Sequence, residues 1–85
     1  MEANQFGIGE AIEQLKQGKK IRRKFWQRQD KSLFLTNLPA KKEVSGEVIR
    51  YFEKAIAVNL ADGKLEGWVP NFYDLFADDY YVVEG

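Results

Sequence analysis

The sequence predicts an α+β domain, a small antiparallel β-sheet with an N-terminal amphipathic helix and a short C-terminal helical turn. Three observations support this class: an apolar helical repeat near the start, two extended segments around Asp62-Gly63, and a short helical segment before a final strand. With 85 residues the chain is expected to form one domain, 1–85, which hides only about 60–65% of the surface of its unfolded chain.

The expected helix covers roughly residues 9–17. Gly18 follows it as a C-terminal stop, and Lys16 lies late in the helix, where a cation is favoured. Its apolar face consists of Ile8, Ala11, Ile12 and Leu15.

Residues 19–26 are expected to form the first strand. Side chains alternate across a strand, so Ile21 and Phe25 share one face and Trp26 points to the other. This interpretation turns Trp26 away from the apolar residues of its own strand.

A polar loop over 27–31 and a short strand over 32–36 follow, closed by Asn37-Leu38-Pro39. Residues 40–53 leave two alternatives open. They are a short helix lined by Val44, Val48, Ile49 and Phe52, or a strand from Val48 to Phe52.

Residues 55–68 indicate a hairpin with a two-residue type I′ turn at Asp62-Gly63. Pairing Ala61 with Lys64 sets Trp68 opposite Ala57, on the face away from the core. A large indole beside a small residue is a platform for a flat ligand, and the alternative is that a helix, a loop or another subunit covers it. The expected core face carries the pairs Leu60 and Leu65, Val58 and Gly67, and Ile56 and Val69.

Pro70-Asn71 ends this hairpin, residues 72–77 predict one or two helical turns, and residues 79–83 predict a last strand. The chain has no cysteine and no histidine, so oligomerisation is the support left for so small a fold. No segment resembles a signal peptide or approaches the ~20 apolar residues that span a bilayer. We therefore expect a soluble, intracellular protein without a membrane partner.

Charge is unevenly distributed although the formal net charge is zero. Residues 16–31 have a net charge of +7, and the chain from residue 61 onward has a net charge of −5. One interpretation is an anion site in the first half. The other is attraction between the two halves, within the fold or between subunits.

Catalytic chemistry is poorly supplied. Without histidine and cysteine, Ser–His–acid and Cys–His sites are excluded, and we expect no enzyme and no cofactor. Gly7-Ile8-Gly9 lacks the preceding strand and third glycine of a dinucleotide fingerprint. Asp74, Asp78 and Asp79 are too sparse a set to predict a metal site.

The residues that point to a function are Arg23, Trp26, Trp68 and Asp74. Indole faces stack on nucleobases, a guanidinium binds phosphate with two hydrogen bonds, and a carboxylate accepts from base or ribose donors. These groups predict a nucleotide site. They leave open whether the ligand is a small nucleotide or a single strand of nucleic acid.

Two segments resemble a known family. Ile8-Gly9-Glu10-Ala11-Ile12 and the following LKQGKKI, with Arg23 and Trp26, resemble its FGEAL…LK-x-GKKV-x-R-x-GW opening. Ala61-Asp62-Gly63 and Trp68, followed by Asn71, Asp74, Ala77, Asp79 and Tyr80, are similar to its ADG…W-x-x-S-x-x-D-x-x-A-x-D-W ending. This is the phage family of Thoeris anti-defence proteins of the second kind, and the resemblance covers roughly 8–37 and 54–83.

The resemblance implies a small nucleotide sponge in the host cell cytoplasm. Members of the family are taken to form tetramers, each a dimer of dimers, and to sequester glycocyclic ADP-ribose, a cyclic ADP-ribose-type signal, without hydrolysing it. Some relatives are thought to bind cyclic dinucleotides. The implied partners are therefore a small cyclic nucleotide and further copies of the chain.

The resemblance also implies which residues bind the ligand. Trp26 and Trp68 match the base-stacking tryptophans, Arg23 the arginine before the first and Asp74 the acid after the second. The ligand-binding set is expected to be Arg23, Trp26, Trp68, Asn71 and Asp74. The chain departs from the family pattern at Ile8, Phe25, Asn71 and Tyr80, which replace Phe, Gly, Ser and Trp.

Two further classes remain as alternatives. One is a module for single-stranded nucleic acid that uses the basic segment 16–31, against which the zero net charge argues. The other is a protein-binding inhibitor whose exposed tryptophans are the strongest contacts with a partner.

Overall fold

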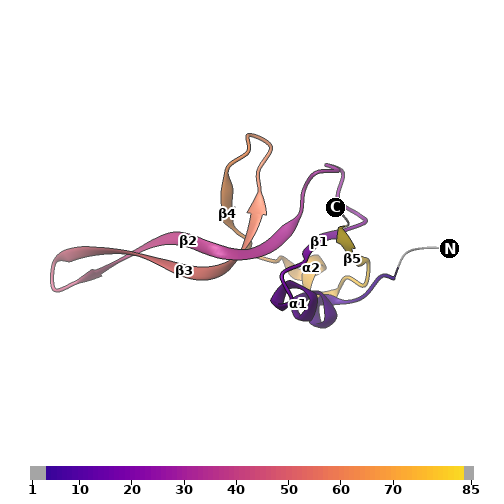
Figure 1. The fold of residues 1–85 in the computed structure, drawn as a ribbon, viewed down its shortest axis with the longest axis horizontal. Coiled ribbons are helices and arrows are strands. Elements are labelled where there is room, and N and C mark those ends of the chain that lie inside the picture. The colour runs from indigo at the N-terminus through magenta and orange to yellow at the C-terminus, as the bar shows by residue number, and fades with distance from the viewer. Residues whose placement is uncertain (1–3, 84–85) are drawn as a thin grey trace.

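The computed structural model describes residues 4–83, and the molecule measures 56 × 26 × 24 Å. A compact body carries a long two-stranded hairpin that projects to one side (Figure 1). The elements are α1 (Ile8–Lys16), β1 (Lys20–Arg23), β2 (Leu33–Val44), β3 (Glu47–Asn59), β4 (Leu65–Gly67), α2 (Phe72–Phe76) and β5 (Tyr80–Val83).

The five strands form one sheet in the order β4-β3-β2-β1-β5, and every pairing is antiparallel. β1 pairs with β5 over its whole length but with β2 only at Ile21 and Leu33. The predicted α+β class, with its N-terminal helix and short C-terminal helix, is confirmed.

α1 matches the expected helix to within one residue at each end. Gly18 ends it with a φ of 87°, and its N–H donates to the Leu15 carbonyl at 2.9 Å. The buried side chains of α1 are Ala11 and Leu15. Neither helix in the described part of the chain is long and apolar enough to cross a membrane.

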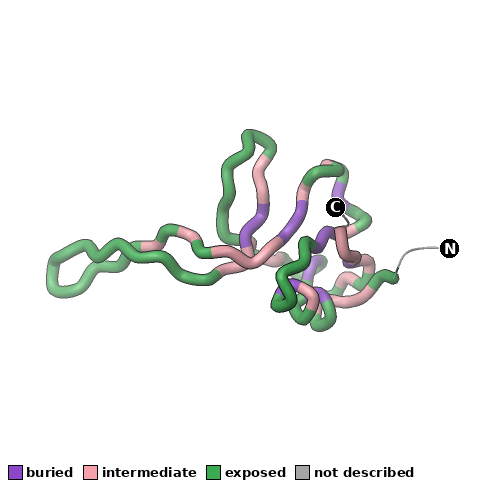
Figure 2. The backbone as a smooth tube through the Cα atoms, in the orientation of Figure 1, coloured by how far each residue is buried: buried purple, intermediate pink, exposed green. Residues whose placement is uncertain are grey.

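The core lies in the body, between α1, the sheet and the loop after β1 (Figure 2). Tyr80 from β5 is fully buried there. The buried cluster consists of Ala11, Leu15, Ile21, Trp26, Leu33, Val58 and Tyr80.

The projecting hairpin, called the arm below, consists of residues 37–54. These are the parts of β2 and β3 that extend past the Thr36–Ala55 pair towards the turn. Ser45 and Gly46 have φ values of 51° and 83°, which is the type I′ geometry of a two-residue turn. The strand alternative for 40–53 is therefore correct and the helix alternative is wrong. The expected end of the strand at 37–39 is also wrong, because β2 runs through Pro39, where its outer edge has no neighbouring strand to bond.

The β3–β4 hairpin differs by one residue from the expected register. Val58 pairs with Glu66 and Ala57 with Gly67. The connection is a three-residue loop over 61–63, in which Gly63 alone has a positive φ, of 88°. Its N–H donates to the Leu60 carbonyl at 2.9 Å, and Leu60 N–H donates to the Lys64 carbonyl at 2.7 Å. A type I′ turn would need a positive φ at Asp62 as well.

This one-residue shift moves Trp68 to the other face of the sheet. Its N–H donates to the Ile56 carbonyl at 2.8 Å, so Trp68 shares a face with Ile56 and Val58. The indole packs partly buried against the core cluster. The expected platform beside Ala57 is wrong, and so is the expected core position of Val69, which is exposed.

The expected strand 19–26 is also too long. β1 ends at Arg23, and the chain then turns, with Trp26 N–H donating to the Arg23 carbonyl at 3.2 Å. The turn breaks the alternation of faces, so Trp26 enters the core at 9% exposure whereas Phe25 is 70% exposed. The expected arrangement of these two side chains is thereby reversed.

Two glycine substitutions test the backbone geometry of the loop between β3 and β4. Gly63→Ala should lower the free energy of unfolding by about 1 kcal/mol, because alanine is strained at a positive φ. Gly9→Ala should raise it by about 0.5–1 kcal/mol, because Gly9 is inside α1 and a Cβ there meets no atom within 4 Å. Urea unfolding of both variants measures the difference, and a Gly63→Ala variant as stable as Gly9→Ala would contradict the positive φ at Gly63.

Candidate functional site

The five expected ligand-binding residues lie together around the start of α2, where they line two adjoining hollows. The first, called the Trp26 hollow, has a volume of about 440 Å³ and is lined by Arg23, Phe25, Trp26, Lys31, Asn71, Tyr73 and Asp74. The second, called the Trp68 hollow, has a volume of about 340 Å³ and includes Trp68, Arg28, Asn59 and Glu66 in its wall. Lys31, Asn71 and Asp74 belong to both walls, so the two hollows form one composite site.

The start of α2 is fixed by a reciprocal pair of hydrogen bonds. Asn71 is the N-cap, and its Oδ1 accepts from Asp74 N–H at 2.8 Å while Asp74 Oδ2 accepts from Asn71 N–H at 3.0 Å. Asparagine is among the residues that cap helices best. The capping box holds both side chains at the junction of the hollows.

Arg23 lies between two carboxylates. Its Nη1 is 2.9 Å from Asp74 Oδ1 and its Nε is 2.8 Å from Asp79 Oδ1. All three side chains are mostly buried, so Arg23 ties β1 to α2 and to the segment just before β5. The expected attraction between the basic and acidic halves therefore operates within the fold. A phosphate-binding role for Arg23 remains a prediction and would have to use its remaining donors.

The ionisation of this cluster follows from its geometry. Burial lowers the pKa of Arg23, but hydrogen bonds to Asp79 and Asp74 outweigh burial and raise it overall. Burial raises the pKa of Asp79, but hydrogen bonds from Arg23 and from Phe25 N–H outweigh that effect and lower it overall. Arg23 and Asp79 are therefore both charged in the folded protein at neutral pH.

Trp26 shares its ring with a cation. The Lys31 Nζ lies 4.4 Å from the ring centroid, within the range of a cation–π contact. The rest of the indole is packed into the core. A ligand base that stacks on Trp26 therefore has to use the face that Lys31 covers.

Sequence reasoning missed the residue that shapes the loop after β1. Arg22 is only 3% exposed, and its guanidinium donates to the carbonyls of four loop residues: Trp26, Arg28, Gln29 and Lys31. A charged residue in a short strand is more often solvated. The feature of the sequence that could have indicated a buried Arg22 is the polar segment 27–31, because the backbone carbonyls of such a loop need hydrogen-bond donors.

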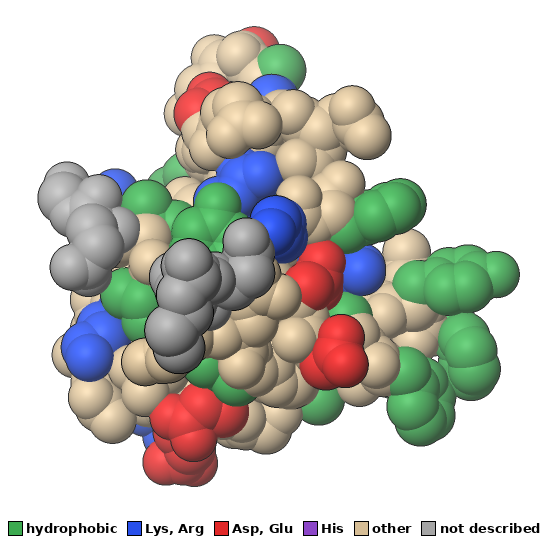
Figure 3. All heavy atoms as spheres, turned by 90° about the vertical axis from the view of Figure 1, so that its right-hand side faces the viewer, with side chains coloured by type: hydrophobic (Ala, Val, Ile, Leu, Met, Phe, Trp, Pro, Cys, Tyr) green, Lys and Arg blue, Asp and Glu red, His purple; other side chains and the backbone are tan. Residues whose placement is uncertain are grey.

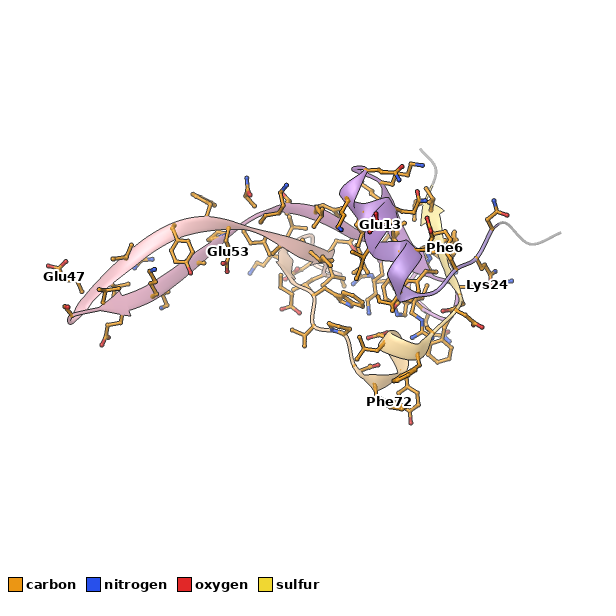
Figure 4. All side chains as sticks on the ribbon, turned by 90° about the horizontal axis from the view of Figure 1, so that it is seen from below. Phe6, Glu13, Lys24, Glu47, Glu53 and Phe72 are labelled. Atoms are coloured by element: carbon orange, nitrogen blue, oxygen red, sulfur yellow. The ribbon has the colours of Figure 1, made fainter. Side chains whose placement is uncertain are left out.

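Exposed aromatic side chains lie beside the Trp26 hollow. Phe72, Tyr73 and Phe76 of α2 are exposed and contact one another through Phe72. Hydrophobic side chains protrude together on one side of the body (Figure 3), and Phe72 points away from the sheet (Figure 4). Tyr73 and Phe25 belong to this surface and also line the Trp26 hollow.

Acidic residues of the site do not gather for a metal. In residues 4–83 no group of three or more Asp or Glu side chains is placed to hold an ion. Asp74 and Asp78 do not share a helix face, because α2 ends at Phe76. Asp74 and Asp79 are engaged with Arg23 instead.

Tyr80 provides a pH test of the buried side of the site. Its hydroxyl donates to the Asp74 carbonyl at 2.5 Å, and burial, with the charge of Asp74, raises its pKa to about 12. The folded state favours the neutral phenol, so this contribution to stability is present below pH 10 and is lost as pH rises towards about 12. Ultraviolet titration should show a phenol ionising near pH 12 that Tyr80→Phe removes. An unchanged titration in that variant would contradict the buried hydroxyl.

Comparison with known proteins gives two similarities. The family model described as the Thoeris anti-defense 2-like domain matches residues 6–83. A curated relative named Thoeris anti-defense 2, from Bacillus phage SP01, is 35% identical, and the match covers 89% of this chain and 92% of the relative. The range matched by the family model spans the positions of all five residues of the expected site.

Proposed function

The chain belongs to the Thoeris anti-defense 2-like family, and from this premise we propose that it is a non-enzymatic sponge for a nucleotide immune signal. The signal is of the glycocyclic ADP-ribose type, and its capture in the host cytoplasm blocks a bacterial anti-phage defence. The family supports the anti-defence role. The observation that carries the sponge mechanism is the composite site, in which two tryptophan-containing hollows share Lys31, Asn71 and Asp74.

The composition of the two hollows suits a nucleotide. Aromatic rings can stack on a base, the cations can neutralise phosphate, and carboxylate and amide groups can accept from or donate to ribose and base. Lys31 and Trp26 supply the first two in one hollow. Arg28 and Trp68 supply them in the other.

The energy needed for capture favours a site closed by a second copy. Stacking supplies about 1–3 kcal/mol per base, whereas nanomolar binding needs about −12 kcal/mol. Both hollows are open on the surface of one chain, so further contacts are required. The exposed aromatic side chains of Phe72, Tyr73 and Phe76 beside the entrance are suited to meeting another protein surface.

The arm supports a homo-oligomer, arranged as a dimer of dimers. A two-stranded hairpin alone is marginally stable in water, and this one runs to Glu47 at its tip without a covering layer (Figure 4). Its exposed large hydrophobic side chains are Val44, Val48, Ile49, Tyr51 and Phe52. Light scattering should give about four times the mass of one chain, and Ile49→Asp with Phe52→Asp should reduce it. A monomeric unchanged chain contradicts the oligomer.

Calorimetric titration tests the sponge. Cyclic ADP-ribose-type signal, a cyclic dinucleotide and a single-stranded oligonucleotide would each be added to the purified protein. We expect saturable heat for the first. Stronger binding of the cyclic dinucleotide would assign the protein to a related defence system, and affinity for the oligonucleotide that falls steeply with salt would indicate a nucleic-acid module. Absence of heat with both cyclic ligands contradicts the sponge.

The exposed aromatic surface of α2 favours a second candidate, a protein-binding inhibitor. Phe72, Tyr73 and Phe76 project from one short helix, and aromatic residues carry much of the energy of protein interfaces. Stable capture of a host protein in the absence of nucleotide, lost in Phe76→Ser, distinguishes this candidate from the sponge.

A further inference from the structure

Three cations line the composite site, and they differ in what they already bind. Arg23 is held by Asp74 and Asp79 at 2.9 and 2.8 Å. Arg28 Nε is 2.9 Å from Asp30 Oδ1, and its Nη2 donates to the carbonyl of Asn59. Both guanidinium groups therefore have structural partners that a ligand would have to replace.

Lys31 is different. The salt bridges found among residues 4–83 pair Lys31 with no carboxylate, and its Nζ instead lies over the Trp26 ring. Its side chain is partly buried and lines both hollows. An ammonium in this position is the cation of the site most readily available to an incoming anion.

The backbone at Lys31 is fixed even though its ammonium is available. Lys31 N–H donates to the Arg28 carbonyl at 3.2 Å, and the Lys31 carbonyl accepts from the buried Arg22 at 3.2 Å. Ser32 follows, with its N–H donating to Asn59 Oδ1 at 2.8 Å. Because the chain is anchored on both sides of Lys31, its side chain can change partner without a change in the loop.

We infer that Lys31 binds the phosphate groups of the captured nucleotide, its ammonium leaving the Trp26 face as a ligand base takes that place. This inference rests on the proposed sponge function and assigns the phosphate contact within it. The exchange keeps the lysine paired in both states, with the indole when the site is free and with phosphate when it is filled. Arg23 then acts as a positioning residue that holds Asp74, not as the principal phosphate ligand.

The test compares Lys31→Met with Lys64→Met, a matched removal of an exposed lysine just after the β3–β4 loop. Two probes are titrated into each protein: the cyclic ADP-ribose-type signal and adenosine, which has no phosphate. Lys31→Met should weaken binding of the signal by about 30-fold or more, since it removes the partner of a desolvated charge. It should leave the binding of adenosine unweakened. Lys64→Met should change neither. Lys31→Arg should restore most of the affinity.

The outcomes separate the inference from the function on which it rests. If the unchanged chain binds neither probe, the inference about Lys31 and the proposed sponge function are both contradicted. If the unchanged chain binds the signal and Lys31→Met binds it equally well, the inference alone falls. If Lys31→Met weakens the binding of the signal and of adenosine equally, the inference is also overturned, because a structural role of Lys31 would affect both probes. Circular dichroism confirms the fold of each variant, and Lys31→Gln replaces Lys31→Met if the latter does not fold.

Discussion

Replacing Arg23 with alanine is expected to lower the free energy of unfolding by about 3–5 kcal/mol, because it leaves the buried carboxylate of Asp74 and the partly buried carboxylate of Asp79 without their cation. Asp74 and Asp79 both depend on this guanidinium. Globular domains unfold with only about 5–15 kcal/mol, so the loss should lower the melting temperature by roughly 12 °C or more. Thermal unfolding followed by circular dichroism measures it.

The control for Arg23→Ala is Lys16→Ala. Lys16 forms an exposed ion pair with Glu13 at 3.2 Å, and exposed pairs contribute about 0–1 kcal/mol. Arg23 should also matter less at low pH. Asp79 has a lowered pKa in the folded state, so its contribution is present above its ordinary pKa of 3.8 and is lost as pH falls through the folded value. Similar effects of the two substitutions at neutral pH would contradict the buried cluster.

Trp26→Ala is expected to cost about 3–5 kcal/mol of stability, the usual result of removing a large aromatic side chain from a core. The adjacent Phe25→Ala should cost much less, because Phe25 is 70% exposed while Trp26 is 9% exposed. Urea unfolding of the two variants measures the difference. This pair discriminates well because a continuous strand over 19–26 predicts the opposite order.

Trp26→Phe extends this prediction to binding. Phenylalanine keeps most of the core volume but offers a weaker face to a cation or a base. The variant should remain folded and bind the nucleotide less tightly. A variant that unfolds as readily as Trp26→Ala would show that the core cannot accept the smaller ring, and full affinity in a folded variant would contradict stacking on Trp26.

Local signals explain the parts of the fold that the sequence predicted well. α1 follows from an apolar repeat and a glycine stop, and α2 from a cap at Asn71 with Asp74 in its first turn. The β3–β4 hairpin was also predicted, but with the wrong turn type. Asp62-Gly63 fits a two-residue type I′ turn as well as the last two positions of a three-residue loop, and the choice between them shifts every pairing by one.

The errors about Trp26 and Trp68 have the same physical origin. Each prediction extended strict alternation through a point where the backbone departs from it, a turn after Arg23 and the extra loop residue before Lys64. Both indoles consequently pack against the core rather than standing free of it. The expected site residues still lie close together, because Asn71 and Asp74 line both the hollow with Trp26 and the hollow with Trp68.

Other features depend on contacts between distant segments and gave no local signal. Arg22 is buried because four carbonyls of the loop 26–31 need a donor. Lys31 enters the site only because that loop folds back over Trp26. The residues of the arm, by contrast, fit a helix and a strand equally well. In the structure they form a hairpin, and its turn has positive φ values at Ser45 and Gly46.

The most direct measurement of the central claim asks whether the protein removes a nucleotide signal from solution and returns it unchanged. The cyclic ADP-ribose-type signal is mixed with excess protein and filtered, and the retained protein is then heated and its released small molecules are identified by mass spectrometry. We predict that the signal disappears from the filtrate and is recovered intact after heating. A signal that stays in the filtrate, or is recovered as a linear hydrolysis product, would contradict capture without catalysis.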